Sequence, residues 1–141
     1  MLNLGFGELS PRVVRMNRYM ELRFKIECLR DLAVVGCSGR LVRGAALDEL
    51  RRQVEELENI RVLVLDFSEI DQVDAGGLGA LLLLRRWAMK HSVQMKLVNP
   101  SPFVRRILDA TRLTSVFEIS SLEDALSILR APACPQRYAV A

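Results

Sequence analysis

The stretch "VLVLDFSEIDQVDAGGLGALL", residues 62–82, changes character along its length. A nearly continuous apolar segment at 61–67 is typical of a central strand covered on both faces. The acidic segment that follows, 68–74, is expected to be a loop. A cluster of glycines then leads into a Leu-rich segment, which predicts a largely buried helix over 78–90. Alternating elements of this length favour an α/β fold with helices packed against a sheet.

The glycine cluster does not match the known phosphate-binding loops. A dinucleotide fingerprint needs a third small residue where Leu82 stands, and an acidic residue roughly 20 positions further on. A P-loop needs Lys followed by Ser or Thr after its last glycine, where this sequence has Ala80 and Leu81. We therefore interpret the cluster as a turn that lets the helix approach the sheet closely and leaves its first turn open to a partner.

Two strands and a helix are predicted before this stretch. Alternation over 22–28 predicts a half-buried strand, and 32–37 predicts a second strand after a short turn, which favours an antiparallel hairpin. Apolar residues at helical spacing predict a helix over 45–57. The first segment, 1–19, has no sustained periodicity and is expected to be a poorly ordered N-terminal extension.

Four further elements are predicted after the Leu-rich helix. They are a strand at 94–98, a helix capped by Ser101 with Pro102 at its first position, a strand at 116–119 and a helix that begins with a capping box at Ser121. The order is β-β-α-β-α-β-α-β-α. A mixed sheet with helices packed against it is the expected architecture.

Length and composition fit one globular domain. The chain has 141 residues, of which 50% are hydrophobic and 26% charged. We assign the domain to 20–131 and a frayed C-terminal tail to 132–141. The net charge of +3 comes from 20 basic and 17 acidic residues spread along the chain. That spread argues against nucleic acid as a partner.

The sequence favours a cytoplasmic location. Its three cysteines, Cys28, Cys37 and Cys134, are odd in number and lack metal or redox spacing, which is typical of reduced thiols. The longest apolar run, 78–84, is too short to cross a bilayer, and no cleavable signal is visible. We therefore expect no direct membrane insertion.

Catalytic and metal sites find little support. The one histidine, His91, is expected at the end of a helix, where an imidazole favours the last carbonyls. The acidic residues Asp66, Glu69, Asp71 and Asp74 do not have the spacing of a calcium loop and are interpreted as a solvated rim. The chain is thus predicted to be no enzyme, with no catalytic residues, no metal and no cofactor.

The start of the Leu-rich helix is the candidate binding surface. Asp74 precedes it and is placed to cap the exposed N–H groups at the positive end of the helix dipole. Gly76 and Gly77 allow the backbone to turn and to approach its neighbours closely. The result is a flat ledge that suits a partner protein.

Four blocks in this order resemble the STAS domain, the family of bacterial anti-sigma factor antagonists. The resemblance covers about 22–130 and rests on "LAVVGCSGRLV", "VLVLDFSEIDQVDAGGLGALL", "KLVNPSPFVRRIL" and "VFEISSLEDAL". It implies a role in transcription regulation, in which the protein binds an anti-sigma factor, usually a serine kinase, at this helix start. The partner-binding residues carried over are Ser68, Asp74, Ala75, Gly76, Gly77 and Leu78.

The phosphorylation motif of that family is degenerate here. The family pattern D-S-[ST]-G-L-G reads Asp-Ala-Gly-Gly-Leu-Gly at 74–79, so Ala75 stands at the lost phospho-acceptor position and Gly76 at its neighbour. Neither can accept a phosphate. The nearest upstream hydroxyl, Ser68, matches a common family position and is interpreted as a loop cap; modification of Ser68 or Ser92 stays open.

Two classes of function remain. In the first, the chain is a sigma-regulatory binding module whose ledge is always competent, and Gly76→Glu is expected to abolish binding. In the second, it is an accessory or scaffold subunit, like the STAS proteins of lipid-transport ATPases or of stress-sensing assemblies. The missing acceptor favours the second class, whereas nothing in the sequence marks a transporter partner. Whether the chain forms a homodimer is left open.

Overall fold

The computed structural model describes residues 12–16, 21–121 and 123–124. Within these residues, a six-stranded mixed sheet has its strands in sequence order, antiparallel from the first to the third and parallel from the third to the sixth. The elements are β1 (Arg12–Met16), β2 (Leu22–Leu29), β3 (Leu32–Leu41), α1 (Ala45–Glu55), β4 (Val62–Val73), α2 (Ala75–Lys90), β5 (Gln94–Val98), α3 (Pro102–Ala110) and β6 (Glu118–Ser120). The predicted single mixed α/β fold is confirmed.

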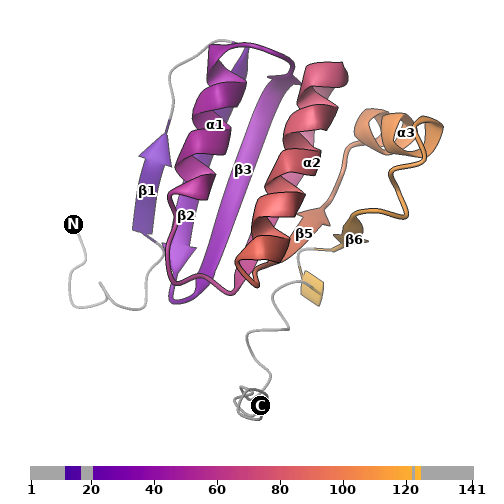
Figure 1. Cartoon of the computed structure of the whole chain (residues 1–141). Coiled ribbons are helices and arrows are strands. Elements are labelled where there is room, and N and C mark those ends of the chain that lie inside the picture. Colours follow the sequence, from indigo (N-terminus) through magenta and orange to yellow (C-terminus); the bar gives the residue numbers. More distant parts are fainter. Residues whose placement is uncertain (1–11, 17–20, 122, 125–141) are drawn as a thin grey trace.

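Helices α1 and α2 lie side by side on one face of the sheet, and α3 lies on the β5 side of α2 (Figure 1). The main core fills the space between these helices and the sheet, where Leu63, Leu65 and Phe67 of β4 are fully buried. Successive side chains of a strand point to opposite faces, so Val62 and Val64 belong to a second, smaller cluster on the other face. β4 is thus buried on both faces over its first half, as its continuous apolar sequence predicts.

The predicted β2–β3 hairpin is confirmed. Its strands pair antiparallel from Leu22 opposite Gly39 to Leu29 opposite Leu32. Arg30 in the turn has a φ of 56°. The carboxylate of Asp31 accepts a hydrogen bond from Nε of Arg61 at 2.8 Å, which ties this turn to the residue before β4.

The predicted acidic loop at 68–74 is wrong over most of its length. The chain stays in β4 up to Val73, because β3 also extends to Leu41 and pairs with it in parallel. Two register shifts interrupt this pairing, one between Gly36 and Ser38 and one between Gly39 and Arg40. Such irregularities break the two-residue alternation by which a strand is recognised in a sequence.

The N-terminal segment also departs from the prediction. Residues 12–16, expected within a poorly ordered extension, form β1 and pair antiparallel with β2, again with a register shift. In this pairing a short segment adds to the outer edge of β2 through backbone hydrogen bonds. Because backbone groups make these bonds, the sequence of the segment shows no clear two-residue alternation. The remaining parts of the extension, 1–11 and 17–19, lie outside the described residues.

The C-terminal helix is described only at its start. Glu123 and Asp124 are helical, and the N–H of Asp124 donates to Oγ of Ser121 at 3.1 Å, as the predicted capping box requires. The residues over which this helix is predicted to continue, and the tail at 132–141, lie outside the described residues, so the domain limits 20–131 stay a prediction.

The start of α2 packs directly on the end of β3. A Cβ atom added at Gly77 would lie 2.0 Å from the carbonyl oxygen of Leu41, a backbone atom that has little freedom to move. A Cβ atom added at Gly79, one half-turn further along the same helix, would meet nothing within 4 Å. Only the first of these glycines is required by packing.

This difference gives a paired prediction. Gly77→Ala is expected to lower the free energy of unfolding by about 3 kcal/mol or more, because the new methyl overlaps a fixed carbonyl. Gly79→Ala is expected to raise it by up to about 1 kcal/mol, because alanine is the better helix former. Urea unfolding followed by circular dichroism measures both. Equal effects of the two substitutions would contradict this account.

Candidate functional site

The carboxylate of Asp74 connects the start of α2 to the chain that follows β3. Its Oδ1 accepts a hydrogen bond from the N–H of Gly77 at 2.8 Å, which caps the helix. The N–H of Arg43 donates to both carboxylate oxygens at 3.2 Å. The N–H of Asp74 itself donates to the carbonyl of Leu41 at 3.3 Å. One side chain and its backbone thus hold two segments in register.

The surroundings of Asp74 favour its charged form. The N–H of Gly77, followed by the N–H groups of Arg43 and Gly76, hold the pKa of the carboxyl below its ordinary value. The expected cap is therefore confirmed in geometry, and the carboxylate also gains donors from outside its own helix.

The second glycine of the site, Gly76, lies against the β3–α1 connection. A Cβ atom added there would lie 2.8 Å from Cβ of Arg43 and 3.3 Å from its Cα. At this spacing the first turn of α2 rests on the connection at a point where residue 76 has no side chain. The close approach that the sequence predicted for the glycine cluster is present at both Gly76 and Gly77.

We define the helix-start ledge as residues 74–79. The structure brings five of the predicted partner-binding residues together there: Asp74, Ala75, Gly76, Gly77 and Leu78. Ala75 is exposed, Gly76 and Leu78 are half-buried, and Gly77 is buried. The outward surface of the ledge therefore consists of the exposed carboxylate of Asp74 and the small side chain of Ala75, and it has no hydroxyl group.

Ser68 does not belong to this ledge. It is exposed within β4, and its N–H donates to Oδ1 of Asp66 at 3.0 Å. A strand advances about 3.3 Å per residue, so Ser68 lies up to about 20 Å from Asp74. Ser68 is assigned to the partner-binding set by resemblance to a family position and interpreted as a loop cap, but the segment around it belongs to strand β4.

Sequence reasoning missed the contribution of the β3–α1 connection. Arg43 and Asp74 are 31 residues apart, and the contact uses the backbone of Arg43 rather than its side chain. No residue type or spacing signals such a contact. The parallel pairing that brings Leu41 beside Val73 creates it.

Other candidate groups are arranged as structural residues. Burial raises the pKa of the Cys37 thiol far above its ordinary value, and the charge of Asp66 adds to the effect, so this thiol is a poor nucleophile. His91 caps the end of α2, as predicted, and its Nδ1 lies 2.8 Å from the carbonyl oxygen of Trp87. Within 21–121 and the other described positions, no three His, Cys, Asp or Glu residues gather in a way that would hold a metal ion.

A family model for the STAS domain matches residues 23–125. The chain belongs to the STAS domain family. The match includes all of the helix-start ledge and the β3–α1 connection that supports it.

Relatives of two kinds share this STAS domain. Over 83 residues the chain is 30% identical to a probable sulfate transporter of Arabidopsis thaliana, an alignment that covers 59% of this chain and 13% of the transporter. Over 60 residues it is 40% identical to a STAS-domain containing protein of Pseudomonas aeruginosa, covering 43% of this chain and 59% of that protein. The alignments thus span only part of either relative.

Solved structures show the same STAS fold. The anti-sigma factor antagonist SpoIIAA in its unphosphorylated form superposes with a TM-score of 0.65 at 22% identity, covering 76% of this chain and 96% of that one. An anti-sigma factor antagonist from Mycobacterium paratuberculosis gives a TM-score of 0.64 at 24% identity, covering 78% and 95%. At these identities the likeness establishes the fold.

None of the helices in the described part of the chain has the length and apolar character needed to span a membrane.

The cap gives a prediction for the stability of the domain. Asp74→Ala is expected to lower the free energy of unfolding by about 1–2 kcal/mol at neutral pH, because the N–H of Gly77 loses its acceptor. Asp74→Asn is expected to cost less, since asparagine is also a good N-cap. Urea unfolding measures both variants, with Asp71→Asn, an exposed carboxylate of β4, as the control.

The pH dependence follows from the lowered pKa of Asp74. The folded state binds this proton more weakly than the unfolded state, so the stabilisation is complete above about pH 4 and is lost as the pH falls through the folded pKa. The difference in unfolding free energy between wild type and Asp74→Asn should therefore shrink below about pH 4. A constant difference down to acidic pH would contradict the assigned role.

Proposed function

We propose that the protein is a non-catalytic, protein-binding regulatory module of the cytoplasm that resembles an anti-sigma factor antagonist. It binds an anti-sigma factor or serine kinase-like protein through the helix-start ledge. The observation that carries this proposal is the construction of the ledge: its backbone is fixed by Asp74 and Arg43, while its outward surface at Ala75 is small and exposed. A preformed flat surface loses little entropy when a partner binds.

The ledge is proposed to be competent for binding at all times. The family pattern releases its partner when a hydroxyl at this turn is phosphorylated, since a phosphate adds about −1.5 to −2 charges at a fitted contact. Ala75 and Gly76 have no hydroxyl, and Ser68 lies away from the ledge. Control of the complex then falls to the abundance of this protein or to its partner.

The second candidate is an accessory or scaffold subunit of a transport or stress-sensing assembly. The identity shared with a plant sulfate transporter favours it, because that protein also contains a matching segment. A lipid-transport ATPase, or other STAS proteins, would be the partner in this case. Both candidates use a protein partner, and identification of that partner separates them.

Ala75→Glu is the substitution that tests the ledge. Gly76→Glu, which the sequence favoured, would also push against Cβ of Arg43 and so disturb the fold. Ala75 is exposed at the first position of α2, where an acidic side chain agrees with the helix dipole. We expect Ala75→Glu to keep its fold and to weaken partner binding by about 100-fold, because a second negative charge and a longer side chain enter the contact.

The measurement is an affinity capture from native cells followed by titration calorimetry with the purified partner. Gln94→Glu is the matched control: it adds the same charge at an exposed position opposite Val62, at the other end of β4 from the ledge, and should bind within about threefold of wild type. Wild-type affinity in Ala75→Glu would exclude the ledge as the binding surface. Capture of a transport protein in place of an anti-sigma factor would support the second candidate.

A further inference from the structure

Beyond the ledge, the outer face of α2 carries both exposed apolar side chains and basic side chains. The large apolar side chains that are exposed in the described part of the chain all belong to this helix: Leu82 is 40% exposed, Leu83 41% and Met89 63%. Ala75, Gly79, Leu82, Arg86 and Met89 recur at spacings of three or four and therefore share one side of the helix. We call these five residues, with Leu83 and Lys90 beside them, the outer stripe.

The charges of α2 are of one sign. Arg85, Arg86 and Lys90 are its charged residues, and Arg86 and Lys90 are exposed. None of the three forms an ion pair with another described residue. The outer stripe is therefore apolar in its first half, and its second half carries the basic side chains of Arg86 and Lys90 around the exposed Met89.

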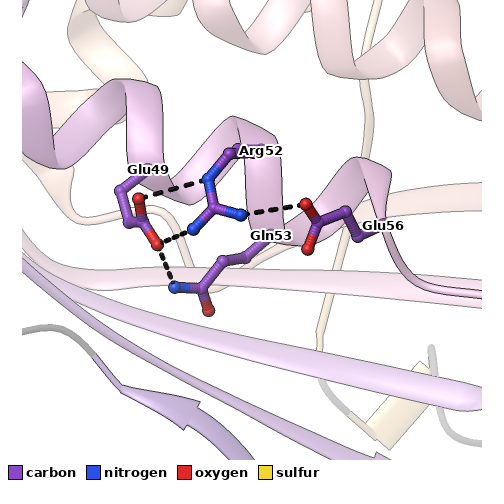
Figure 2. A network of polar contacts seen from close by, with 4 residues as sticks. All are labelled: Glu49, Arg52, Gln53 and Glu56. Atoms are coloured by element: carbon purple, nitrogen blue, oxygen red, sulfur yellow. Dashed lines mark hydrogen bonds and ion pairs between the residues drawn. The ribbon is translucent and has the colours of Figure 1, made fainter.

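Helix α1 on the same face of the sheet is arranged differently. Arg52 lies between two glutamates of its own helix: its Nε donates to Glu49 at 3.3 Å and its Nη1 to Glu56 at 2.9 Å (Figure 2). Gln53 donates to Glu49 as well. Elsewhere on α1, Arg51 pairs with Glu55 at 3.4 Å. The basic groups of α1 thus have acidic partners within the chain, and those of α2 have none among the described residues.

We propose that the outer stripe docks against a partner surface with an apolar patch and an acidic rim. The patch receives Ala75, Gly79 and Leu82, and the rim pairs with Arg86 and Lys90. A helix rises about 1.5 Å per residue, so the acidic groups that pair with Arg86 and Lys90 lie about 16 to 22 Å along the helix from the contact made by Ala75. This inference rests on the proposed function and names the chemistry of its partner: the apolar half supplies affinity, and the basic half steers association.

Charge complementarity favours such a partner over a second copy of this chain. A second copy would bring the same three basic side chains and no acidic residue on α2. In an antiparallel pair of α2 helices, Arg86 of each copy would also approach the positive end of the other helix dipole. An acidic partner removes both repulsions.

The test uses a double charge reversal, Arg86→Glu with Lys90→Glu. The matched control reverses Arg105 and Arg106, which are exposed on α3 rather than α2 and have no ion-pair partner among the described residues. Each full-length variant is compared with the wild type for capture of proteins from native cells. Association and dissociation rates are then measured with the purified partner at about 0.05 M and 0.5 M salt.

The expected result is a loss of affinity of tenfold or more in the α2 double variant at low salt, mostly in the association rate, falling to less than about threefold at high salt. The α3 double variant should bind within about threefold of wild type at both concentrations. An equal loss of affinity in both double variants, or no loss of affinity in the α2 double variant at low salt, would overturn the proposed acidic rim of the partner.

Further outcomes separate this inference from the proposed function. If Ala75→Glu abolishes binding and the α2 double variant binds normally, the ledge is correct and the acidic rim is wrong. If nothing is captured by the wild type, both fail. Two other results would also overturn the acidic rim. In the first, the purified wild type dimerises in sedimentation and the α2 double variant does not. In the second, the wild type binds phosphatidylcholine–phosphatidylserine vesicles, the α2 double variant does not, and both capture the same proteins.

Discussion

The hydrogen bonds of the Asp74 carboxylate join two parts of the chain that are 31 residues apart. One part is the first turn of α2, and the other is the connection between β3 and α1. Because Gly77 lies against the carbonyl of Leu41, the distance between α2 and the end of β3 is fixed as well as the residue at which the helix begins. The position of every outward side chain of α2 depends on this junction. A shift of the helix by one residue would turn a different set of side chains toward solvent.

The two helices on this face of the sheet differ in how their charges are compensated. On α1, the arginines and glutamates neutralise one another at helical spacing, which is typical of a face that remains in water. On α2, apolar and basic side chains are both turned outward. Exposed ion pairs add little to stability, so the lack of them on α2 costs the fold little and leaves its charges free for recognition.

The sequence predicted elements whose residues carry their own periodicity. The alternation of β2, the apolar run that begins β4, the Ser101 cap of α3 and the helical spacing of α1 were all visible. The Leu-rich run predicted α2 as a helix, but the prediction that this helix is largely buried was wrong, since Leu82, Leu83 and Met89 are exposed. What the sequence did not show were pairings between distant backbones. The second half of β4 is held by β3 across two register shifts, and the support of the ledge comes from the N–H of Arg43. These contacts depend on topology, which side-chain types do not encode locally.

The junction at Asp74 is made by backbone donors, and this has a consequence for how the family can diversify. The N–H groups that bind the carboxylate belong to the backbone of residues 43 and 77. Residue 77 must remain glycine, whereas the side chain of residue 43 takes no part in these hydrogen bonds. The side chain at residue 75 takes no part in the junction, so an acceptor hydroxyl can disappear from that position without any compensating change in the scaffold. The phosphorylation site and the junction that supports the ledge can therefore be inherited separately. A member of the family can lose the acceptor hydroxyl and keep the junction at Asp74.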